Sequence, residues 1–249
     1  MQFQIASDLH IEYNNDTVPD VDKFIKPETD VLILPGDIGS LYKYNQLEGF
    51  LQKICKMFKI VIYIPGNNEY YMQKDIKPLS LYVLEQRLRS IENKIENLYV
   101  LDKSSIKIND VCIAGCTLWS EPKGHVPKYI VRIHGMNTQI YKNKFTKDSE
   151  YIKKITNYCN QNNLKLIVVT HHVPSYDIVP EARKKDKFIS LYASDMNKFI
   201  ENNKIDTWIC GHMHRNIDQK LGDTRFVTNQ MGKPKDDIKD FKKSFIITV

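Results

Sequence analysis

Short apolar runs alternate with amphipathic segments along most of this chain, a pattern typical of α/β proteins. Most of the runs are continuously apolar, so we expect strands that are covered on both faces. After an N-terminal strand that begins at Phe3, the runs lie at 31–34, 60–64, 111–114, 164–169, 207–210, 225–227 and 244–249.

Four segments between these strands place apolar residues at helical spacing. The first helix is expected over 45–58, where Leu47, Leu51 and Ile54 share one face. The others are expected from Pro78 to Ile91, over 147–162, and from Ser194, a candidate N-cap, to Asn203.

Residues 97–118 interrupt the alternation of strands and helices. Two short apolar runs, 98–101 and 106–108, precede the run at 111–114 with a turn at Asn109-Asp110, which predicts adjacent antiparallel strands. Alternation followed by such a meander predicts two packed sheets with helices outside. No Gly/Ser-rich linker or internal repeat divides the chain, so we expect one domain over residues 1–249. Long loops are expected at 119–145 and 173–192.

The composition narrows the class of protein. Hydrophobic residues make up 42% of the 249 residues, which suits a substantial core, yet no apolar stretch approaches the roughly 20 residues that span a bilayer. The five cysteines lie mostly in apolar runs and predict buried, reduced thiols, so we expect a cytoplasmic protein.

The formal net charge of +6 favours an anionic partner, such as a phosphate-bearing or nucleic-acid substrate. A surface of scattered, solvated lysines is the alternative explanation. The basic cluster Arg183-Lys184-Lys185 has the same two interpretations, a solvated turn or a contact with a substrate phosphate.

Polar side chains follow five of the predicted strands. Open α/β folds place their sites at the carboxyl ends of strands, so we expect these side chains to meet. Because residues two apart in an extended segment point the same way, Asp8 and His10 are expected to converge. The glycines that precede three of the motifs allow sharp turns. The motifs are Asp8-Leu9-His10, Gly36-Asp37, Gly66-Asn67-Asn68-Glu69, His171-His172 and Gly211-His212-Met213-His214.

The motifs supply enough donors for two metal ions. If Asp37 bridges the two ions, each has four protein ligands, and positions remain for water and substrate oxygens. The mixture of imidazole, carboxylate and amide suits Mn²⁺, Fe²⁺/Fe³⁺, Zn²⁺ or Ni²⁺ better than Ca²⁺ or Mg²⁺. The seven donors are Asp8, His10, Asp37, Asn67, His171, His212 and His214.

The ordered series of motifs over residues 8–214 resembles the calcineurin-like metallophosphoesterase superfamily. The resemblance implies a four-layer α/β/β/α sandwich of two mixed sheets flanked by helices, with a binuclear metal centre at the sheet ends. It implies that one metal is held by Asp8, His10, Asp37 and His214, and the other by Asp37, Asn67, His171 and His212. His172 would stand behind the ligands.

Asn68 departs from the family pattern, which has a histidine at this position. That histidine contacts the scissile phosphate and protonates the leaving oxygen, whereas an amide delivers no proton at neutral pH. Asn68 is then either the natural residue of an enzyme of low or altered activity, or an engineered replacement, which the intact metal ligands favour. His10 or Asn68 would stabilise charge on the phosphoryl oxygens. Arg215 is a candidate phosphate contact, with plain exposure as the alternative.

The resulting hypothesis is a metal-dependent phosphoesterase. Compact length and the basic balance favour phosphodiesters, such as a cyclic nucleotide, a dinucleotide or RNA. Tyr70 and Tyr71 would wall the pocket, stack on a base or simply pack. Three alternatives stay open: a catalytically inactive metal- and anion-binding protein, a phosphomonoesterase, and an enzyme that uses one metal.

Overall fold

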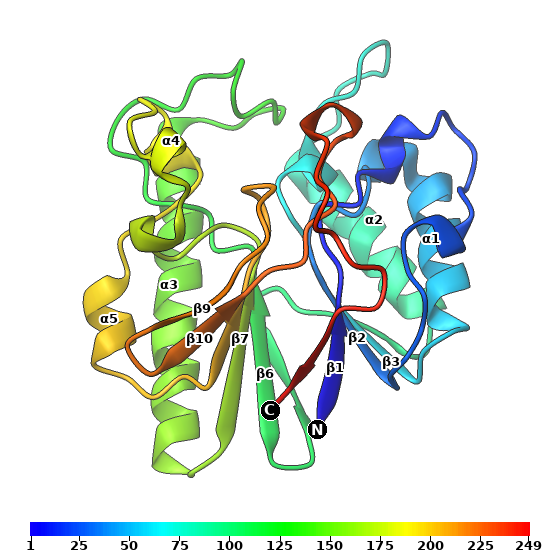
Figure 1. Cartoon of the computed structure of the whole chain (residues 1–249). Helices are drawn as coiled ribbons and strands as arrows, with labels where there is room; N and C mark the ends of the chain where they lie inside the picture. The colour runs from blue at the N-terminus through cyan, green and yellow to red at the C-terminus, as the bar shows by residue number, and fades with distance from the viewer.

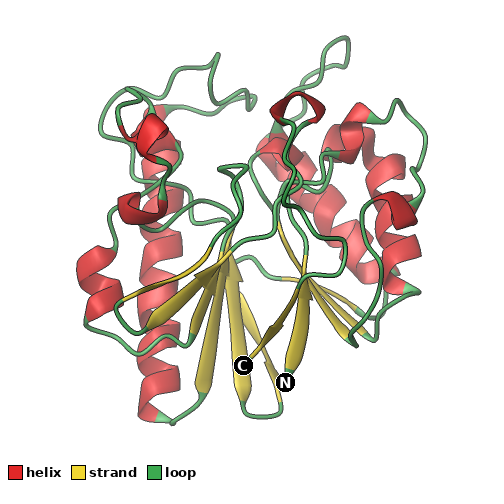
Figure 2. Ribbon diagram, in the orientation of Figure 1, coloured by secondary structure: helices red, strands yellow, loops and turns green.

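The computed structural model describes residues 1–249 as two mixed β-sheets that face each other, with helices on both outer sides (Figures 1 and 2). The first sheet has the order β11-β1-β2-β3-β4, in which only β11 runs antiparallel to its neighbour. Its strands are β1 (Gln2–Ile5), β2 (Val31–Pro35), β3 (Ile60–Ile64), β4 (Leu98–Val100) and β11 (Ile246–Thr248).

The second sheet has the order β5-β6-β7-β8-β10-β9. Its four central strands are parallel, and antiparallel strands form both edges. Its strands are β5 (Ser104–Ile108), β6 (Val111–Cys116), β7 (Lys165–Thr170), β8 (Thr207–Ile209), β9 (Asp218–Leu221) and β10 (Thr224–Val227).

The helices cover the outer face of each sheet. Helices α1 (Tyr44–Cys55) and α2 (Leu81–Lys94) pack on the first sheet, while α3 (Thr138–Gln161) and α5 (Asn197–Glu201) pack on the second. The short α4 (Glu181–Lys184) lies above the second sheet in Figure 1.

Three apolar layers separate these four structural layers. One lies under α1 and α2, one under α3 and α5, and the third fills the space between the two sheets. Every residue of β2 is buried, because one side of this strand faces the helices and the other faces the second sheet. The expected sandwich of two mixed sheets between helices is confirmed.

The expected meander over 97–118 is wrong in its first part. Strand β4 pairs in parallel with β3 in the first sheet, and only β5 and β6 form a hairpin, with Asn109 in its turn at φ 55°. Short apolar runs do not encode which strand they pair with, so sequence proximity to the hairpin was misleading.

Several element boundaries also differ from the expectation. Helix α2 begins after the N-cap Ser80 instead of at Pro78, and α3 begins at Thr138, inside the expected loop over 119–145. Ser194 does not cap α5, because its hydroxyl accepts a hydrogen bond from the Glu121 amide. Strand β9 was missed, since its residues are mostly exposed and polar.

The five cysteines are buried and unpaired, as expected. No helix combines the length and the hydrophobicity that crossing a bilayer requires.

The apolar layer between the sheets generates a stability prediction. Ile167 of β7 is fully buried in that layer, so Ile167→Ala should lower the free energy of unfolding by about 2–5 kcal/mol through lost apolar burial and a cavity. Urea unfolding followed by circular dichroism measures the change. The exposed Lys107 of β5 provides the control, because Lys107→Ala should stay within about 0.5 kcal/mol. A loss below about 1 kcal/mol for Ile167→Ala would contradict this account of the core.

Candidate metal centre

Two groups of ligand atoms meet where strands of both sheets end. Asp8, His10, Asp37 and His214 form one group, and Asp37, His171 and His212 form the other. Within each group the ligand atoms all lie within 4.8 Å of one another. The Asn67 Oδ1 atom is 2.9 Å from His171 Nε2 and so joins the second group. All seven donors expected from the sequence therefore lie together, with Asp37 common to both groups.

The histidines of the first group turn their Nε2 atoms toward each other. His10 Nδ1 lies 2.9 Å from Glu12 Oε1, and His214 Nδ1 lies 2.5 Å from Asp236 Oδ2, so each carboxylate holds the ring proton on Nδ1. The two Nε2 atoms are 3.2 Å apart. Two neutral rings with their protons on Nδ1 would point lone pairs at each other, and a proton or a metal ion between them removes the repulsion, so the residues present fit a metal ion.

The second group has the same arrangement. His171 Nδ1 donates to the Pro35 carbonyl at 2.9 Å, which turns Nε2 toward Asp37 Oδ1 at 3.3 Å and His212 Nδ1 at 3.1 Å. A backbone acceptor thus fixes the ring, as carboxylates do in the first group.

The electrostatics of the centre also favour a bound cation. Burial alone would raise the pKa of Asp37, but His171 and His10 hold it well below its ordinary value. Burial alone would lower the pKa of His171, but the Asp37 carboxylate raises it to about 9. Burial and the neighbouring His172 and His171 lower the pKa of His212 well below its ordinary value, which keeps this imidazole neutral and able to bind metal.

Most of the donors have a left-handed backbone, a conformation that costs a non-glycine residue on the order of 1–2 kcal/mol. The expected extended geometry of Asp8 and His10 is therefore wrong. Their amides donate to the Gly36 and Asp37 carbonyls of the adjacent loop at 3.0 Å, and this pairing bends the chain toward the other donors. The left-handed donors are Asp8 (φ 53°), His10 (φ 47°), Asp37 (φ 52°), His212 (φ 74°) and His214 (φ 49°).

Glycines allow the loops to approach closely enough for the donors to meet. A Cβ atom on Gly36 would lie 2.4 Å from His171 Nδ1, and one on Gly66 would lie 2.2 Å from Asp37 Oδ1. Only Gly36, at φ 86°, also needs the conformational freedom of glycine. The expectation of sharp turns holds for Gly36, whereas Gly66 is required for space.

Glu69 supports the donors from behind. It lies in one of the predicted motifs, but the motif alone indicates no role for this residue. Its carboxylate is fully buried and accepts hydrogen bonds from the amides of Asp37, Ile38 and Gly66 and from the Tyr63 hydroxyl, at 2.7–3.1 Å. Burial and the charge of Asp37 raise the pKa of Glu69 to about 8. The four donors nevertheless occupy all the acceptor positions of an ionised carboxyl, so we assign it as the carboxylate. Glu69 thereby fixes the loops that carry Asp37 and Asn67.

Glu12 and Asp236 are the other supporting residues that sequence reasoning missed. Glu12 follows His10 by two residues, and this spacing could have signalled their contact. Asp236 lies 22 residues after His214 in a different segment, and no sequence signal links the two.

The candidate catalytic residues are not all brought together. Asn68 is buried beside the donors, where its amide and carboxamide groups both donate to the Asp37 carboxylate. His172 is buried behind His212, and burial and His171 lower its pKa to about 3. Arg215 is exposed and lies outside the cavity at the metal centre.

A cavity of about 440 Å³ opens onto the donors. Asn68 and Tyr71 lie on its wall, while Tyr70 packs in the core beside Trp119. Of the basic cluster at 183–185, only Arg183 reaches the wall. The other wall residues outside the donor groups include Tyr129, Ile130, Arg132, Tyr192, Met213, Lys233, Lys235 and Asp236.

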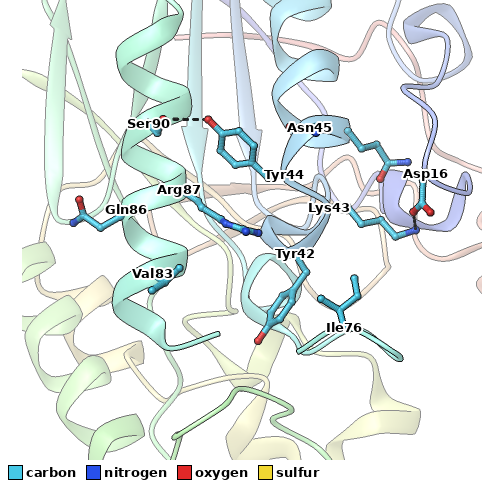
Figure 3. Close-up of a pocket in the computed structure, with 11 residues that line it drawn as sticks. Asp16, Tyr42, Lys43, Tyr44, Asn45, Ile76, Val83, Gln86, Arg87 and Ser90 are labelled. Carbon is cyan, nitrogen blue, oxygen red and sulfur yellow. Dashed lines mark hydrogen bonds and ion pairs between the residues drawn. The ribbon is translucent and has the colours of Figure 1, made fainter. Parts of the chain in front are cut away.

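A larger cavity of about 780 Å³ lies beside α1 and α2, away from every donor (Figure 3). Several of its polar side chains are already engaged by neighbours. The Tyr44 hydroxyl bonds Ser90, Lys43 pairs with Asp16, and Arg87 donates to the Leu41 carbonyl. It contains no group of metal-ligating residues.

The close approach at Gly66 generates a prediction about metal binding. In Gly66→Ala the new methyl group would displace the Asp37 carboxylate, so we expect the loss of at least one of the two metal equivalents that the donor groups predict per chain, measured by elemental analysis after loading with Mn²⁺. Gly124→Ala is the matched control, because a Cβ atom there meets nothing within 4 Å. Full metal content in a folded Gly66→Ala protein would refute this role of Gly66.

Comparison with known proteins gives the same assignment as the motifs. A family model described as calcineurin-like phosphoesterase matches residues 1–216. An uncharacterized protein of Acanthamoeba polyphaga mimivirus is 27% identical over 255 residues, which cover 91% of this chain and 89% of that protein.

Two solved structures show the same fold at low sequence identity. The phosphopantetheinyl hydrolase of Mycobacterium tuberculosis aligns with a TM-score of 0.72 and 14% identity, covering 100% of this chain and 95% of that one. A dimetal phosphatase from Danio rerio aligns with a TM-score of 0.52 and 12% identity, covering 92% and 86%. With the family match over residues 1–216 and the two-sheet fold, the chain belongs to the calcineurin-like phosphoesterase family.

Proposed function

We propose that this chain is a two-metal hydrolase that cleaves phosphodiesters. The observation that carries the proposal is the position of Asp37, whose two carboxylate oxygens face the two groups of donors: Oδ1 lies 3.3 Å from His171 Nε2, and Oδ2 lies 3.8 Å from His10 Nε2. A carboxylate shared in this way suits two ions that act on one phosphate. The donor set supports Mn²⁺, Fe²⁺/Fe³⁺, Zn²⁺ or Ni²⁺.

The bound ions would polarise a phosphoryl oxygen and lower the pKa of a water molecule. The chain's own residues hold this arrangement in place. Glu69 fixes the loops around Asp37, and Asn68 holds the Asp37 carboxylate through two hydrogen bonds. The same carboxamide is a hydrogen-bond donor at the cavity wall, where it can contact a phosphoryl oxygen but supplies no proton.

The cavity beside the donors supports a diester as the substrate. Its volume of about 440 Å³ lies in the range of small-molecule sites, and its tyrosines and cations suit an organic group that carries negative charge. A nucleotide-containing diester, such as a cyclic nucleotide, a dinucleotide or RNA, has these properties. The phosphopantetheinyl hydrolase of Mycobacterium tuberculosis, which has the same fold, is also named as a hydrolase.

We further propose that residues 1–249 act as one domain in the cytoplasm. The apolar layer between the sheets contains residues of both halves of the chain, which supports a single folding unit. Five buried thiols are consistent with a reducing compartment.

A metal- and anion-binding protein without catalytic activity is the second candidate, and Asn68 is the observation that favours it. The expected acid of the family is absent at this position, while the donors are all present. Hydrolysis of nitrophenyl phosphates by the metal-loaded chain distinguishes the two candidates.

The proposal predicts hydrolysis of bis-nitrophenyl phosphate by the chain loaded with Mn²⁺, at a higher kcat/KM than mono-nitrophenyl phosphate. Nitrophenolate is a good leaving group, so the reaction tests the metal centre without requiring a general acid. Removal of metal with a chelator should abolish turnover, and Asp37→Ala should lower kcat/KM by at least about 100-fold.

Asp110→Ala removes an exposed carboxylate of the β5–β6 turn and should leave the rate unchanged. Metal binding without hydrolysis of either ester would favour the binding protein. A preference for the monoester would identify a phosphomonoesterase instead, and one metal equivalent at saturation would contradict the two-metal centre.

A further inference from the structure

We propose that the physiological substrate contains a phosphoric anhydride, so that the group that leaves the scissile phosphorus is a phosphate and not an alcohol. The inference rests on the proposed phosphodiester hydrolysis and narrows its substrate class. Two independent features of the cavity support it: the absence of an imidazole that could protonate the leaving group, and a set of cations without carboxylate partners.

No free imidazole faces the cavity. Of the seven histidines, only His212 and His214 lie on its wall, and both belong to the donor groups. His172 is buried behind them, and neither His125 nor His134 lines the cavity. Asn68 lies on the cavity wall beside the donors, and its carboxamide delivers no proton at neutral pH. The cavity therefore lacks the group that most often protonates a leaving oxygen.

Lysine and tyrosine side chains are weaker acids than an imidazolium, so the missing imidazole restricts the leaving group. An alcohol leaves as an alkoxide unless it is protonated, and its pKa is close to that of water, about 16. A phosphate monoester has a second pKa of about 6 and is stable as an anion at neutral pH. Departure of a phosphate needs charge stabilisation instead of a proton, and cations supply it.

Such cations converge on the cavity from three segments. Arg132 lies on the loop between β6 and α3, Arg183 lies in α4, and Lys233 and Lys235 lie in the C-terminal segment. Figure 1 shows these segments above the ends of the strands. Because they are far apart in sequence, their meeting at one cavity is a property of the fold.

None of the four cations forms an ion pair with a carboxylate. Many other lysines and arginines of the chain do form such pairs. Lys184, next to Arg183, pairs with Glu181 outside the cavity wall. The one supporting carboxylate on the wall, Asp236, is engaged by the His214 ring and the Lys233 amide. Arg132 lies over the Tyr71 ring, 5.1 Å from its centre, a contact that satisfies none of its N–H groups. The four side chains are thus available to an anion, and a substrate with at least two phosphates matches this excess of charge.

Hydrolysis of an anhydride needs no proton on the leaving group. A water oxygen forms a bond to the scissile phosphorus, and the bond from that phosphorus to the bridging oxygen breaks. The electron pair stays on the leaving phosphate, which the cations stabilise. The two protons of the water end on the product phosphates or, above their second pKa of about 6, in the solvent.

A matched pair of substrates tests the proposal. Diadenosine diphosphate and adenylyl-adenosine contain the same nucleosides, but the first releases a phosphate and the second an alcohol. With the Mn²⁺-loaded protein we expect kcat/KM to be at least about 100-fold higher for diadenosine diphosphate, the contribution of a missing general acid. Asn68→His should raise hydrolysis of adenylyl-adenosine by a similar factor and raise hydrolysis of the anhydride by a clearly smaller factor.

Binding provides a second readout that does not need turnover. Arg183→Gln and Lys233→Gln should weaken the binding of the methylene-bridged analogue of diadenosine diphosphate about tenfold each by calorimetry, the order expected for a lost charge-assisted contact. Lys107→Gln removes the same charge from an exposed site on β5 and should have no effect.

Equal rates on the two dinucleotides, or an equal gain on both from Asn68→His, would overturn the anhydride proposal. So would unchanged binding of the analogue in both cavity variants. Absence of turnover on bis-nitrophenyl phosphate would instead overturn the proposed hydrolase itself, so the two failures are distinguishable.

Discussion

The buried carboxylate of Asp37 is the group on which the rest of the site depends. Its two oxygens face different sets of donors, and a carboxylate without solvent requires positive charge and hydrogen-bond donors around it. Glu69 and Asn68 fix its backbone and its oxygens through hydrogen bonds. Gly36 and Gly66 supply the space in which the adjoining loops meet it. A cation at each group would satisfy the whole arrangement at once.

The stability of the fold offsets the strain in the loops that carry the donors. Left-handed conformations at five of the donors cost several kcal/mol in total. Three apolar layers hold the strands that precede and follow these loops, so the loops begin and end at fixed positions. The donors are therefore positioned by packing at a distance and by local hydrogen bonds, which is how folded proteins maintain strained functional loops.

The metal centre and the cavity wall come from different parts of the architecture. The donors stand at the ends of strands in both sheets, while the cations of the wall stand on α4, on the loop before α3 and near the C-terminus. Strand ends fix the chemistry, and the segments above them shape the ligand site. Wall residues such as Arg132 and Arg183 are separate from the donors, so they can vary without disturbing them.

The sequence alone predicted most of the strands, the two packed sheets and the seven candidate donors that the structure brings together, because continuous apolar runs report burial and polar residues at their ends indicate a site. Tertiary structure alone decided that β4 pairs with β3, that Asp236 orients His214, and that the cations meet at one cavity. It also replaced the expected extended geometry at Asp8 and His10 with a left-handed one. Local periodicity records whether a residue is buried, whereas pairing between distant segments depends on how the whole chain packs.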